Sequence, residues 1–507
     1  MAVAILKSRA LAGMQAPVVT VEVHLANGLP GFALVGLPEA EVRESRERVR
    51  AALQTSGFQF PARRITVNLA PADLPKESGR YDLPIAIGVL AASGQIPIQA
   101  VAEYEFAGEL SLNGGLRAVR GALAMAYALA LQKDMSACRK LILPAPSAIE
   151  AALVPNIEIF SACDLLSVCA HLQGITPLPV QQAMSSVLTI DENLDLVDIR
   201  GQRGARRALE IAAAGQHNML LIGPPGSGKS MLANRLPGIL PSMDEHEGLE
   251  SAALRSLSSQ GLKVETWLRR PFRAPHHSAS MVALVGGGGI PKPGEISLAH
   301  HGVLFLDEFP EFSRMALEAL REPLQSGRIS ISRAAQQAEF PARFQLIAAM
   351  NPCPCGYFGH PVRSCSCTPR MISRYQARLS GPLLDRIDMR VLVPSLSTDE
   401  LLNSSKGETS AIVAERVVKA RERQAQRQKK LNQYLFGIDL ETVCAISAQS
   451  KQLLQETQAR LHYSSRAVHR ILRLARTIAD LAASPDIRSA HLVEAIHYQR
   501  AGTIALG

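Results

Sequence analysis

Hydrophobic and polar positions follow two different periods along the first part of the chain. Residues 18–23, 65–69 and 157–160 are short runs rich in β-branched and aromatic residues, which is typical of strands. Residues 39–55 and 121–131 instead place apolar side chains at helical spacing. The pattern therefore predicts an α+β domain over residues 1–175.

The pattern changes further along the chain. A polar stretch without clear periodicity covers residues 176–195 and is expected to be a linker. Residues 196–395 follow the order strand, glycine-rich turn, helix and strand, which predicts a parallel sheet flanked by helices. Residues 396–507 are almost entirely helical in pattern and include a basic stretch, residues 413–430. The fold class predicted from these patterns is α/β, with three domains and one linker.

Composition narrows the class of protein without identifying it. The chain has 507 residues, of which 47% are hydrophobic and 20% charged, as expected for a folded protein with several cores. The longest apolar candidate is shorter than the ~20 residues that span a bilayer, and the N-terminus does not resemble a signal peptide. We therefore expect a cytoplasmic protein with reduced cysteines and no membrane partner. The net charge of +9 suits a polyanionic partner but carries little weight on a chain of this length.

The most specific motif is a glycine-rich turn between an apolar strand, residues 219–222, and a helix that begins near Met231. Backbone N–H groups of such a turn approach phosphate oxygens, its lysine reaches the β- and γ-phosphates, and the following serine ligates Mg²⁺. The eight residues that predict this ATP and Mg²⁺ site are Gly223, Pro224, Pro225, Gly226, Ser227, Gly228, Lys229 and Ser230.

Two later strands end in residues that fit the same chemistry. The apolar run 303–306 ends in Asp307, placed to hold Mg²⁺, and Glu308, placed to orient or activate the attacking water. The apolar run 344–350 ends in Asn351, whose amide can position that water. In isolation the two carboxylates would indicate a helix cap and the asparagine a turn. The phosphate motif nearby favours the catalytic interpretation.

These elements resemble the Walker A, Walker B and sensor 1 elements of AAA+ ATPases, in the same order. Residues 380–388 look like the arginine-finger segment of the branch that holds magnesium chelatase and the MCM helicases, and the segment around Arg466 looks like its sensor 2 helix. The resemblance implies a homo-oligomeric ring, expected to be a hexamer, in which Arg386 completes a neighbour's site. From the residues alone, Arg386 can instead pair with Asp385 or Asp388, and the second arginine can lie on a solvated helix face.

The first domain has two segments that resemble the catalytic stretches of Lon proteases, residues 75–87 and 108–117. Lon-type proteolysis needs a serine nucleophile and a lysine that can lose its proton. In the corresponding places this chain has Asp82 and Arg117, and an arginine cannot serve as that base. The resemblance implies a Lon protease-like domain without proteolysis, unless the nearby Ser78 and Lys76 take these roles.

A Lon-like domain in front of this motor, together with residues 286–308, resembles the YifB/ComM family over essentially the whole chain. Members of this family are understood as hexameric helicases that drive branch migration of DNA in natural transformation. The resemblance implies an AAA+ core with a C-terminal helical lid, and DNA and recombination proteins as partners. Two other functions compete with this one: a protein-remodelling ATPase, and a chelatase motor that drives metal insertion into a porphyrin.

Candidate DNA contacts lie in two predicted hairpins. In the chelatase and MCM branch an insert projects a hairpin toward the pore, and here that insert ends in residues 286–293, which include Lys292. A second hairpin is predicted over residues 327–340, with Arg328 at its start and Arg333 near its tip. Few aromatic residues are nearby, so we expect tracking of the DNA backbone rather than base stacking. The basic stretch in the last domain can add charge, but a solvated helix face is the favoured explanation.

Four cysteines follow Asn351 in two C-x-C pairs joined by a turn-rich stretch. Thiolates brought together in this way can hold Zn²⁺ in a tetrahedral site, with His360 as a substitute ligand. The C-x-C spacing is tighter than usual for zinc, so free thiols and a redox role stay as alternatives. The four candidate ligands are Cys353, Cys355, Cys365 and Cys367. The remaining cysteines are expected in hydrophobic cores: Cys138, Cys163, Cys169 and Cys444.

Overall fold

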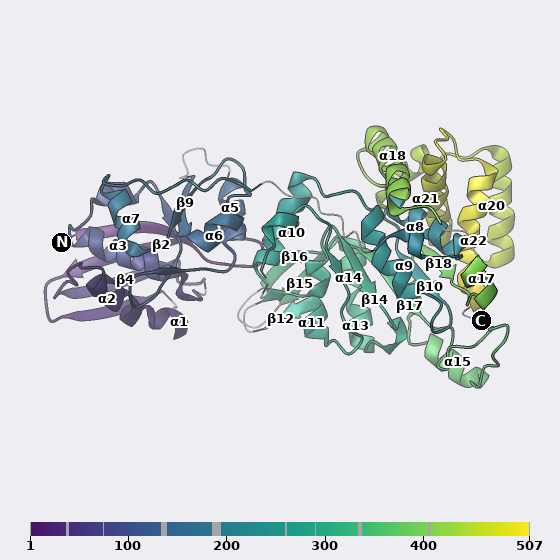
Figure 1. The fold of residues 1–507 in the computed structure, drawn as a ribbon, viewed down its shortest axis with the longest axis horizontal. Helices are drawn as coiled ribbons and strands as arrows, with labels where there is room; N and C mark the ends of the chain where they lie inside the picture. The colour runs from purple at the N-terminus through teal and green to yellow at the C-terminus, as the bar shows by residue number, and fades with distance from the viewer. Residues whose placement is uncertain are drawn as a thin grey trace.

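The molecule is elongated, with one sheet at the N-terminal end, a second sheet in the middle and a group of helices at the C-terminal end (Figure 1). This computed structural model describes residues 2–36, 40–74, 76–132, 139–184, 194–258, 261–288, 291–332, 337–403 and 407–505.

The N-terminal sheet has the strand order β3-β4-β2-β1-β5-β8-β9. Its strands β1, β2 and β4 pair antiparallel, whereas β3, β5, β8 and β9 join through parallel pairs. Buried and half-buried residues alternate along β2, as expected for a strand with one face packed on helix α3. The strands are β1 Ala2–Arg9, β2 Val18–Ala26, β3 Gly31–Val35, β4 Arg64–Ala70, β5 Glu105–Phe106, β8 Lys140–Pro144 and β9 Glu158–Ala162, with a separate hairpin of β6 Glu109–Leu110 and β7 Leu116–Arg117.

Helices cover this sheet. α3 is buried along its whole length, which its apolar sequence requires, and it packs on β1 and β2. The predicted strands and helices of this part are confirmed, except that the first predicted helix is divided in two at Glu44. The helices are α1 Ala40–Arg43, α2 Ser45–Thr55, α3 Asp82–Ala92, α4 Ile98–Val101, α5 Ala122–Ala130, α6 Ala145–Ala151 and α7 Leu165–Leu172.

The central sheet is parallel throughout, in the order β11-β14-β17-β10-β18, as the sequence pattern predicts. Both of its faces are covered: Met219 and Leu221 of β10 belong to one hydrophobic core, and Leu220 and Ile222 to another. This order places the carboxyl ends of β14, β17 and β10 side by side. The strands are β10 Met219–Ile222, β11 Phe272–Arg273, β14 Val303–Leu306, β17 Gln345–Met350 and β18 Met389–Leu392.

Two antiparallel hairpins accompany this sheet, as predicted: β12 Gly286–Gly287 with β13 Lys292–Pro293, and β15 Arg328–Ser332 with β16 Gln337–Pro341. Helix α10 packs against α5, so the N-terminal and central parts share a hydrophobic core. The helices of the central part are α8 Arg203–Gly215, α9 Lys229–Arg235, α10 Glu245–Ser256, α11 Met281–Val285, α12 Glu295–Leu298, α13 Arg314–Ala319, α14 Arg321–Ser326, α15 Pro369–Gln376 and α16 Gly381–Leu384.

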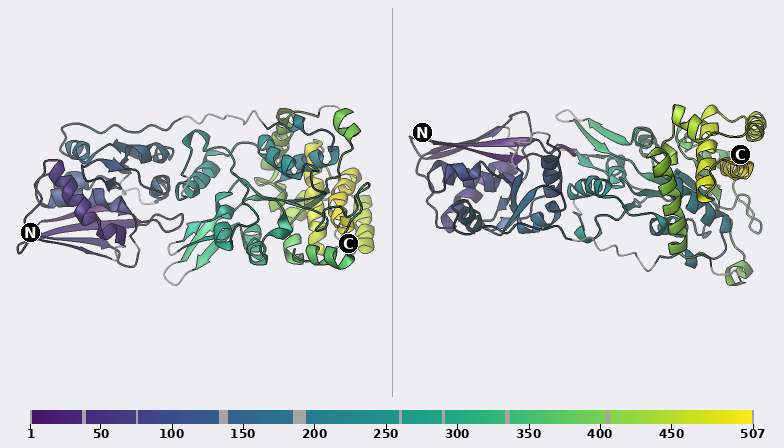
Figure 2. Two further views of the ribbon diagram at one scale, coloured as in Figure 1. Left: turned by 60° about the horizontal axis from the view of Figure 1, so that its bottom comes forward. Right: turned by 90° about the horizontal axis from the view of Figure 1, so that it is seen from above.

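The C-terminal helices stay grouped at one end of the molecule in two further views (Figure 2). α18 and α21 pack on α8, and α22 packs on β18, so these helices share a core with the central sheet. Their bounds are α17 Thr398–Asn403, α18 Ser410–Gln428, α19 Gly437–Val443, α20 Ala448–Leu461, α21 Ser465–Leu481 and α22 Ser489–Ala505.

Candidate nucleotide-binding site

The glycine-rich turn connects the end of β10 to the start of α9. Gly226 and Gly228 have φ angles of +75° and +91°, a backbone conformation that other residues rarely adopt. Gly223 lies so close to Val393 that a Cβ atom would stand 2.1 Å from its carbonyl oxygen. The hydroxyl of Ser227 is buried in the turn without a hydrogen-bond partner in the part of the chain that the structure describes. The turn therefore offers the donors and the space that phosphate groups require.

Lys229 is the central cation of the turn. Its Nζ donates to the carbonyl oxygens of Gly223 and Pro224, both at 2.8 Å. It also donates to Asn351 Oδ1 at 3.2 Å, because β17, which ends just before Asn351, pairs with β10. Burial lowers the pKa of Lys229, and the two nearby carboxylates oppose this shift. The predicted phosphate-binding lysine and the predicted water-positioning asparagine are thus brought together.

The two residues predicted to ligate Mg²⁺ also meet. Ser230 Oγ donates to Asp307 Oδ2 at 2.5 Å. The N–H group of Glu308 donates to the other oxygen of the same carboxylate, Asp307 Oδ1, at 2.9 Å. A hydroxyl and a carboxylate at this separation are oxygen donors of the kind that Mg²⁺ takes beside phosphates and water. The donor set therefore fits a magnesium ion.

A cavity of 810 Å³ collects these groups, and its volume is in the range of small-molecule and cofactor sites. Its walls are the turn, the start of α9, the ends of β14 and β17, and the loop that follows β11. The predicted residues that line it are Pro225, Gly226, Ser227, Gly228, Lys229, Ser230, Asp307, Glu308 and Asn351.

Two histidines that were not predicted from the sequence line the same cavity. His277 Nδ1 lies 2.8 Å from Glu308 Oε2, and the rings of His276 and His277 lie 4.1 Å apart. Both follow β11, which neighbours β14 in the sheet, so the strand order brings them to Glu308. The only signal in the sequence is the His-His pair itself, and this pair has no spacing that is typical of a site.

Arg386 and Arg466 line a second cavity, of 630 Å³, which shares no lining residue with the first. Arg386 donates to the Pro382 carbonyl at 2.7 Å and to Gln325 Oε1 at 2.5 Å. Burial lowers the pKa of Arg386, and the positive charges of Arg321 and Arg466 lower it further. The fold therefore brings the two predicted arginines to each other and not to the phosphate-binding turn of their own chain.

The two aspartates beside Arg386 have other partners. Asp385 pairs with Arg470 at 3.5 Å, and Asp388 pairs with Arg473 at 3.6 Å, both from α21. Arg466 is exposed at the start of the same helix. Further basic residues line this cavity, namely Arg343, Lys430, Arg470 and Arg473. The second cavity is therefore suited to a ligand with negative charge.

The candidate DNA contacts differ in their accessibility. Lys292 is exposed on the short β12–β13 hairpin. The Arg328 side chain is 62% exposed, but it pairs with Glu339 across the β15–β16 hairpin at 2.7 Å. Arg333 lies outside the described residues. Lys292 is thus a more accessible cation than Arg328.

Helix α18 does not present the solvated basic face that was expected from its sequence. Arg416 pairs with Glu210 of α8 at 2.5 Å, and Arg427 pairs with the buried Asp480 of α21 at 2.7 Å. The expectation was wrong because the sequence does not reveal that α8 and α21 present carboxylates to this helix. Arg416 thus connects α18 to α8 of the central part, and Arg427 connects it to α21.

The residues in place of a Lon-type dyad have separate partners. Asp82 is buried at the start of α3 and pairs with Arg48 at 2.6 Å. The hydrogen bond to Asp82 raises the pKa of Arg48. Arg117 is exposed and pairs with Glu109 at 3.4 Å. Asp82 therefore has a structural ion pair where a nucleophile would be needed.

The alternative pair also fails to form a dyad. Ser78 Oγ accepts a hydrogen bond from Arg80 Nε at 2.9 Å, while Lys76 Nζ donates to the Pro71 carbonyl. In the described part of the chain no hydrogen bond joins Ser78 to Lys76.

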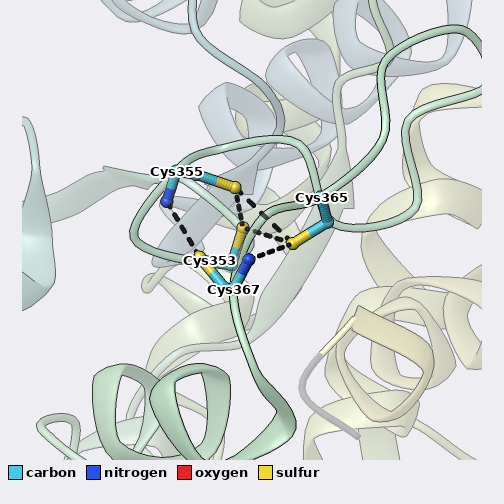
Figure 3. A group of neighbouring side chains, drawn as sticks. All are labelled: Cys353, Cys355, Cys365 and Cys367. Carbon is cyan, nitrogen blue, oxygen red and sulfur yellow. Dashed lines mark hydrogen bonds between the residues drawn. The ribbon is translucent and has the colours of Figure 1, made fainter.

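The four candidate zinc ligands converge in one loop after β17 (Figure 3). Cys353 Sγ lies 3.4 Å from Cys355 Sγ and 3.7 Å from Cys365 Sγ. Cys355 Sγ and Cys365 Sγ lie 3.5 Å apart, and Cys367 Sγ accepts the N–H group of Cys355 at 3.3 Å. The predicted grouping is confirmed as a geometric cluster.

His360 is not a member of this cluster. Its Nδ1 accepts the N–H groups of Val362 and Arg363 at 3.1 Å and 3.0 Å, and its Nε2 lies 2.9 Å from Ser395 Oγ. The expectation of a substitute ligand was therefore wrong, because both ring nitrogens have other partners.

The remaining cysteines only partly follow the prediction. Cys169 and Cys444 are buried, as expected. Cys163 is exposed, because it follows the last residue of β9 at the surface, and Cys138 lies outside the described residues.

A parallel sheet with a glycine-rich phosphate turn after one strand, paired carboxylates after a second and an asparagine after a third defines a nucleotide-binding core of the AAA+ class. The family models of magnesium chelatase cover most of the chain. Subunit ChlI of Mg-chelatase matches residues 21–147, magnesium chelatase subunit ChlI matches residues 195–401, and its C-terminal model matches residues 407–499.

Full-length relatives narrow the class further. The chain is 52% identical over 504 residues to competence protein ComM of Haemophilus influenzae. The aligned residues are 98% of this chain and 98% of that protein. It is 49% identical over 502 residues to the uncharacterized protein YifB of Escherichia coli, covering 98% of this chain and 97% of that protein. The chain therefore belongs to the ComM/YifB family of magnesium chelatase-like AAA+ proteins.

A more distant similarity is confined to part of the chain. The maternal DNA replication licensing factor mcm3 of Xenopus laevis is 28% identical over 176 residues, which are 34% of this chain and 19% of that protein.

Among the residues that the structure describes, none of the helices combines the length and the apolar character needed to cross a membrane.

Proposed function

We propose that this protein is an ATPase in which Lys229 binds the β- and γ-phosphates and Ser230 and Asp307 hold Mg²⁺. The bound ion would neutralise phosphate charge during hydrolysis. Glu308 orients and activates the attacking water, and Asn351 helps to position it. The proposal is supported by the convergence of these side chains on one cavity.

We further infer that the active form is a ring, expected to be a hexamer. The observation that carries this inference is the position of Arg386 and Arg466, which line a cavity separate from the phosphate-binding turn of their own chain. An arginine stabilises the transferring phosphoryl group only at close range. A neighbouring subunit that docks its phosphate turn against the second cavity would bring both arginines to the nucleotide.

We propose that the ring acts on DNA, as a translocase or helicase that promotes branch migration when incoming DNA recombines. Two relatives support this choice, since one is named a competence protein and another a DNA replication licensing factor. The exposed Lys292 is the leading candidate for a phosphate contact, followed by Arg328 and Arg333. Recombination proteins are the expected partners.

The N-terminal part, residues 1–175, is proposed to be a Lon protease-like domain that does not cleave peptide bonds. Asp82 is held by Arg48, and Arg117 cannot act as a base. Residues 176–195 are proposed as a linker, residues 196–395 as the ATPase domain and residues 396–507 as its lid.

The test of this function measures phosphate release with no effector, with forked DNA and with an unfolded polypeptide. We expect forked DNA to stimulate phosphate release and the unfolded polypeptide to leave it unchanged. Stimulation by the polypeptide alone would instead identify a protein-remodelling ATPase. Lys229→Ala serves as the inactive control.

A further inference from the structure

The cysteine loop, residues 353–367, has the sulfur geometry of a site for a single metal ion. Three of its S···S distances are 3.4, 3.5 and 3.7 Å, and all four sulfur atoms lie within 4.8 Å of one another. Four sulfur atoms at the usual Zn–S distance of about 2.3 Å form a tetrahedron with edges of about 3.8 Å. The observed distances match this tetrahedron and are too long for a disulfide bond, which needs ~2.05 Å. The space between the sulfur atoms accommodates one ion and not a cluster of several irons.

Backbone N–H groups surround the sulfur atoms. The N–H group of Phe358 donates to Cys353 Sγ at 3.3 Å, and that of Cys367 donates to Cys365 Sγ at 3.4 Å. Cys355 donates to Cys367 Sγ in the same way. Such donors offset the negative charge that four thiolates place around a divalent ion, and they fix the orientation of each ligand. The loop thus supplies outer-shell groups as well as ligands.

The cysteine loop also lies against the phosphate-binding turn. Gly356, with φ +84°, is so close to Pro225 that a Cβ atom would stand 2.4 Å from the proline Cδ, and 3.8 Å from Asn351 Cγ. Gln376 of α15, which follows the loop, donates to the carbonyl of Pro352, the residue just before the loop, at 3.2 Å. The loop therefore packs against the phosphate-binding turn, next to the point where the predicted water-positioning residue emerges.

We propose that the four thiolates of the cysteine loop hold one Zn²⁺, and that this ion keeps the loop closed against Pro225. The ion is structural, because all four positions of a tetrahedral site are taken by protein sulfur. Loss of the ion opens the loop and weakens nucleotide binding. The coupling to nucleotide binding rests on the proposed ATP site, whereas the metal site itself does not.

The metal site is tested by elemental analysis of the purified full-length chain. We expect one zinc per chain, and X-ray absorption with four sulfur neighbours at about 2.3 Å. Cys355→Ser and Cys365→Ser should lose most of the zinc, while the exposed Cys163→Ser should retain it. A wild-type chain that stays free of zinc after incubation with the ion, or that holds iron instead, would overturn the site. Full zinc content in both loop variants would also overturn it.

The coupling is tested by the affinity for a fluorescent ADP analogue, measured without DNA and without hydrolysis. Removing the metal from the wild-type chain with a chelator should weaken binding several-fold, and reloading with Zn²⁺ should restore it. Gly356→Ala should retain zinc yet bind the analogue more weakly, because the added methyl group pushes the loop away from Pro225. Unchanged affinity in the stripped protein would refute the coupling. A zinc-loaded wild type that binds no nucleotide would refute the proposed ATP site and leave the metal site standing.

Discussion

His277 Nδ1 lies 2.8 Å from Glu308 Oε2, so the carboxylate proposed to activate water is engaged by a histidine of the same cavity. The contact occupies one of the two carboxylate oxygens, so it competes with an attacking water for that oxygen. Both side chains are partly exposed, at 34% for His277 and 54% for Glu308, and exposed pairs are typically worth at most about 1 kcal/mol. We therefore expect the pair to restrain the proposed hydrolysis only weakly.

Replacing His277 by alanine should raise ATP hydrolysis in the absence of DNA by up to about fivefold, the factor that corresponds to 1 kcal/mol. Glu308→Gln should lower it by about 10²- to 10⁴-fold, as expected for loss of a general base. Phosphate release at saturating ATP measures both effects, and His276→Ala is the matched control. A clear loss of activity in His277→Ala would mean that the histidine supports catalysis instead.

Arg386→Ala should lower ATP hydrolysis by about 10³-fold or more, because we propose that this arginine acts on the phosphoryl group of a neighbour's nucleotide. Lys229→Ala should be inactive because it lacks the phosphate-binding lysine. When the two inactive variants are mixed and allowed to assemble, some interfaces combine an intact phosphate turn with an intact arginine, and activity should return. Arg321→Ala, a nearby arginine paired with Glu318, should stay active. Mixtures that stay inactive although they assemble would contradict a shared site.

Arg427→Ala should destabilise the protein without affecting DNA binding. Arg427 donates to both oxygens of Asp480, which is buried, at 2.7 and 3.0 Å. Removing Arg427 takes two charge-assisted hydrogen bonds from this carboxylate, which keeps Arg476 at 3.1 Å, and we expect a loss of about 1–3 kcal/mol. Urea unfolding measures the loss of stability, and a titration with DNA measures the affinity for DNA. Lys292→Ala should show the reverse pattern, with weaker DNA binding at unchanged stability.

Acid should destabilise the packing of His217, which lies between α8 and β10, against α21. Burial lowers the pKa of His217 to about 4, and its Nε2 lies 2.7 Å from Thr477 Oγ1. The unfolded chain binds a proton more tightly than the folded chain does, so this stability is fully present above about pH 6.5 and is lost as the pH falls toward 4.

The loss should reach about 2 kcal/mol at pH 5 relative to pH 8. Urea midpoints of the wild type and of His217→Gln at the two pH values measure it, and the glutamine variant should lose less stability on acidification. The exposed His246→Gln is the control, which should behave like the wild type. An equal acid loss in all three proteins would show that His217 does not titrate as described.

Much of the fold followed from local patterns. The buried run ending at Leu306 and the turn that starts at Gly223 have strong, short signals, since a parallel strand must be apolar and a phosphate turn must contain glycine. The sequence also predicts that Lys229, Asp307 and Asn351 lie close together, because the carboxyl ends of neighbouring parallel strands meet at one edge of the sheet.

Contacts between distant segments were not predictable in the same way. His277 reaches Glu308 only because β11 happens to be the neighbour of β14 in the sheet. Arg427 has a buried partner because α18 packs on α21, and no local pattern distinguishes such an arginine from a solvated one. The position of Arg386 near Arg466 likewise depends on how the helical part docks.

The central claim is that ATP hydrolysis by this protein moves DNA. It is tested most directly by the migration of a synthetic four-way DNA junction, followed on a gel with the purified wild type, Lys229→Ala and Glu308→Gln. We expect ATP-dependent resolution of the junction by the wild type and none by either variant. A wild type that hydrolyses ATP and forms rings, yet neither binds nor moves branched or single-stranded DNA, would contradict it.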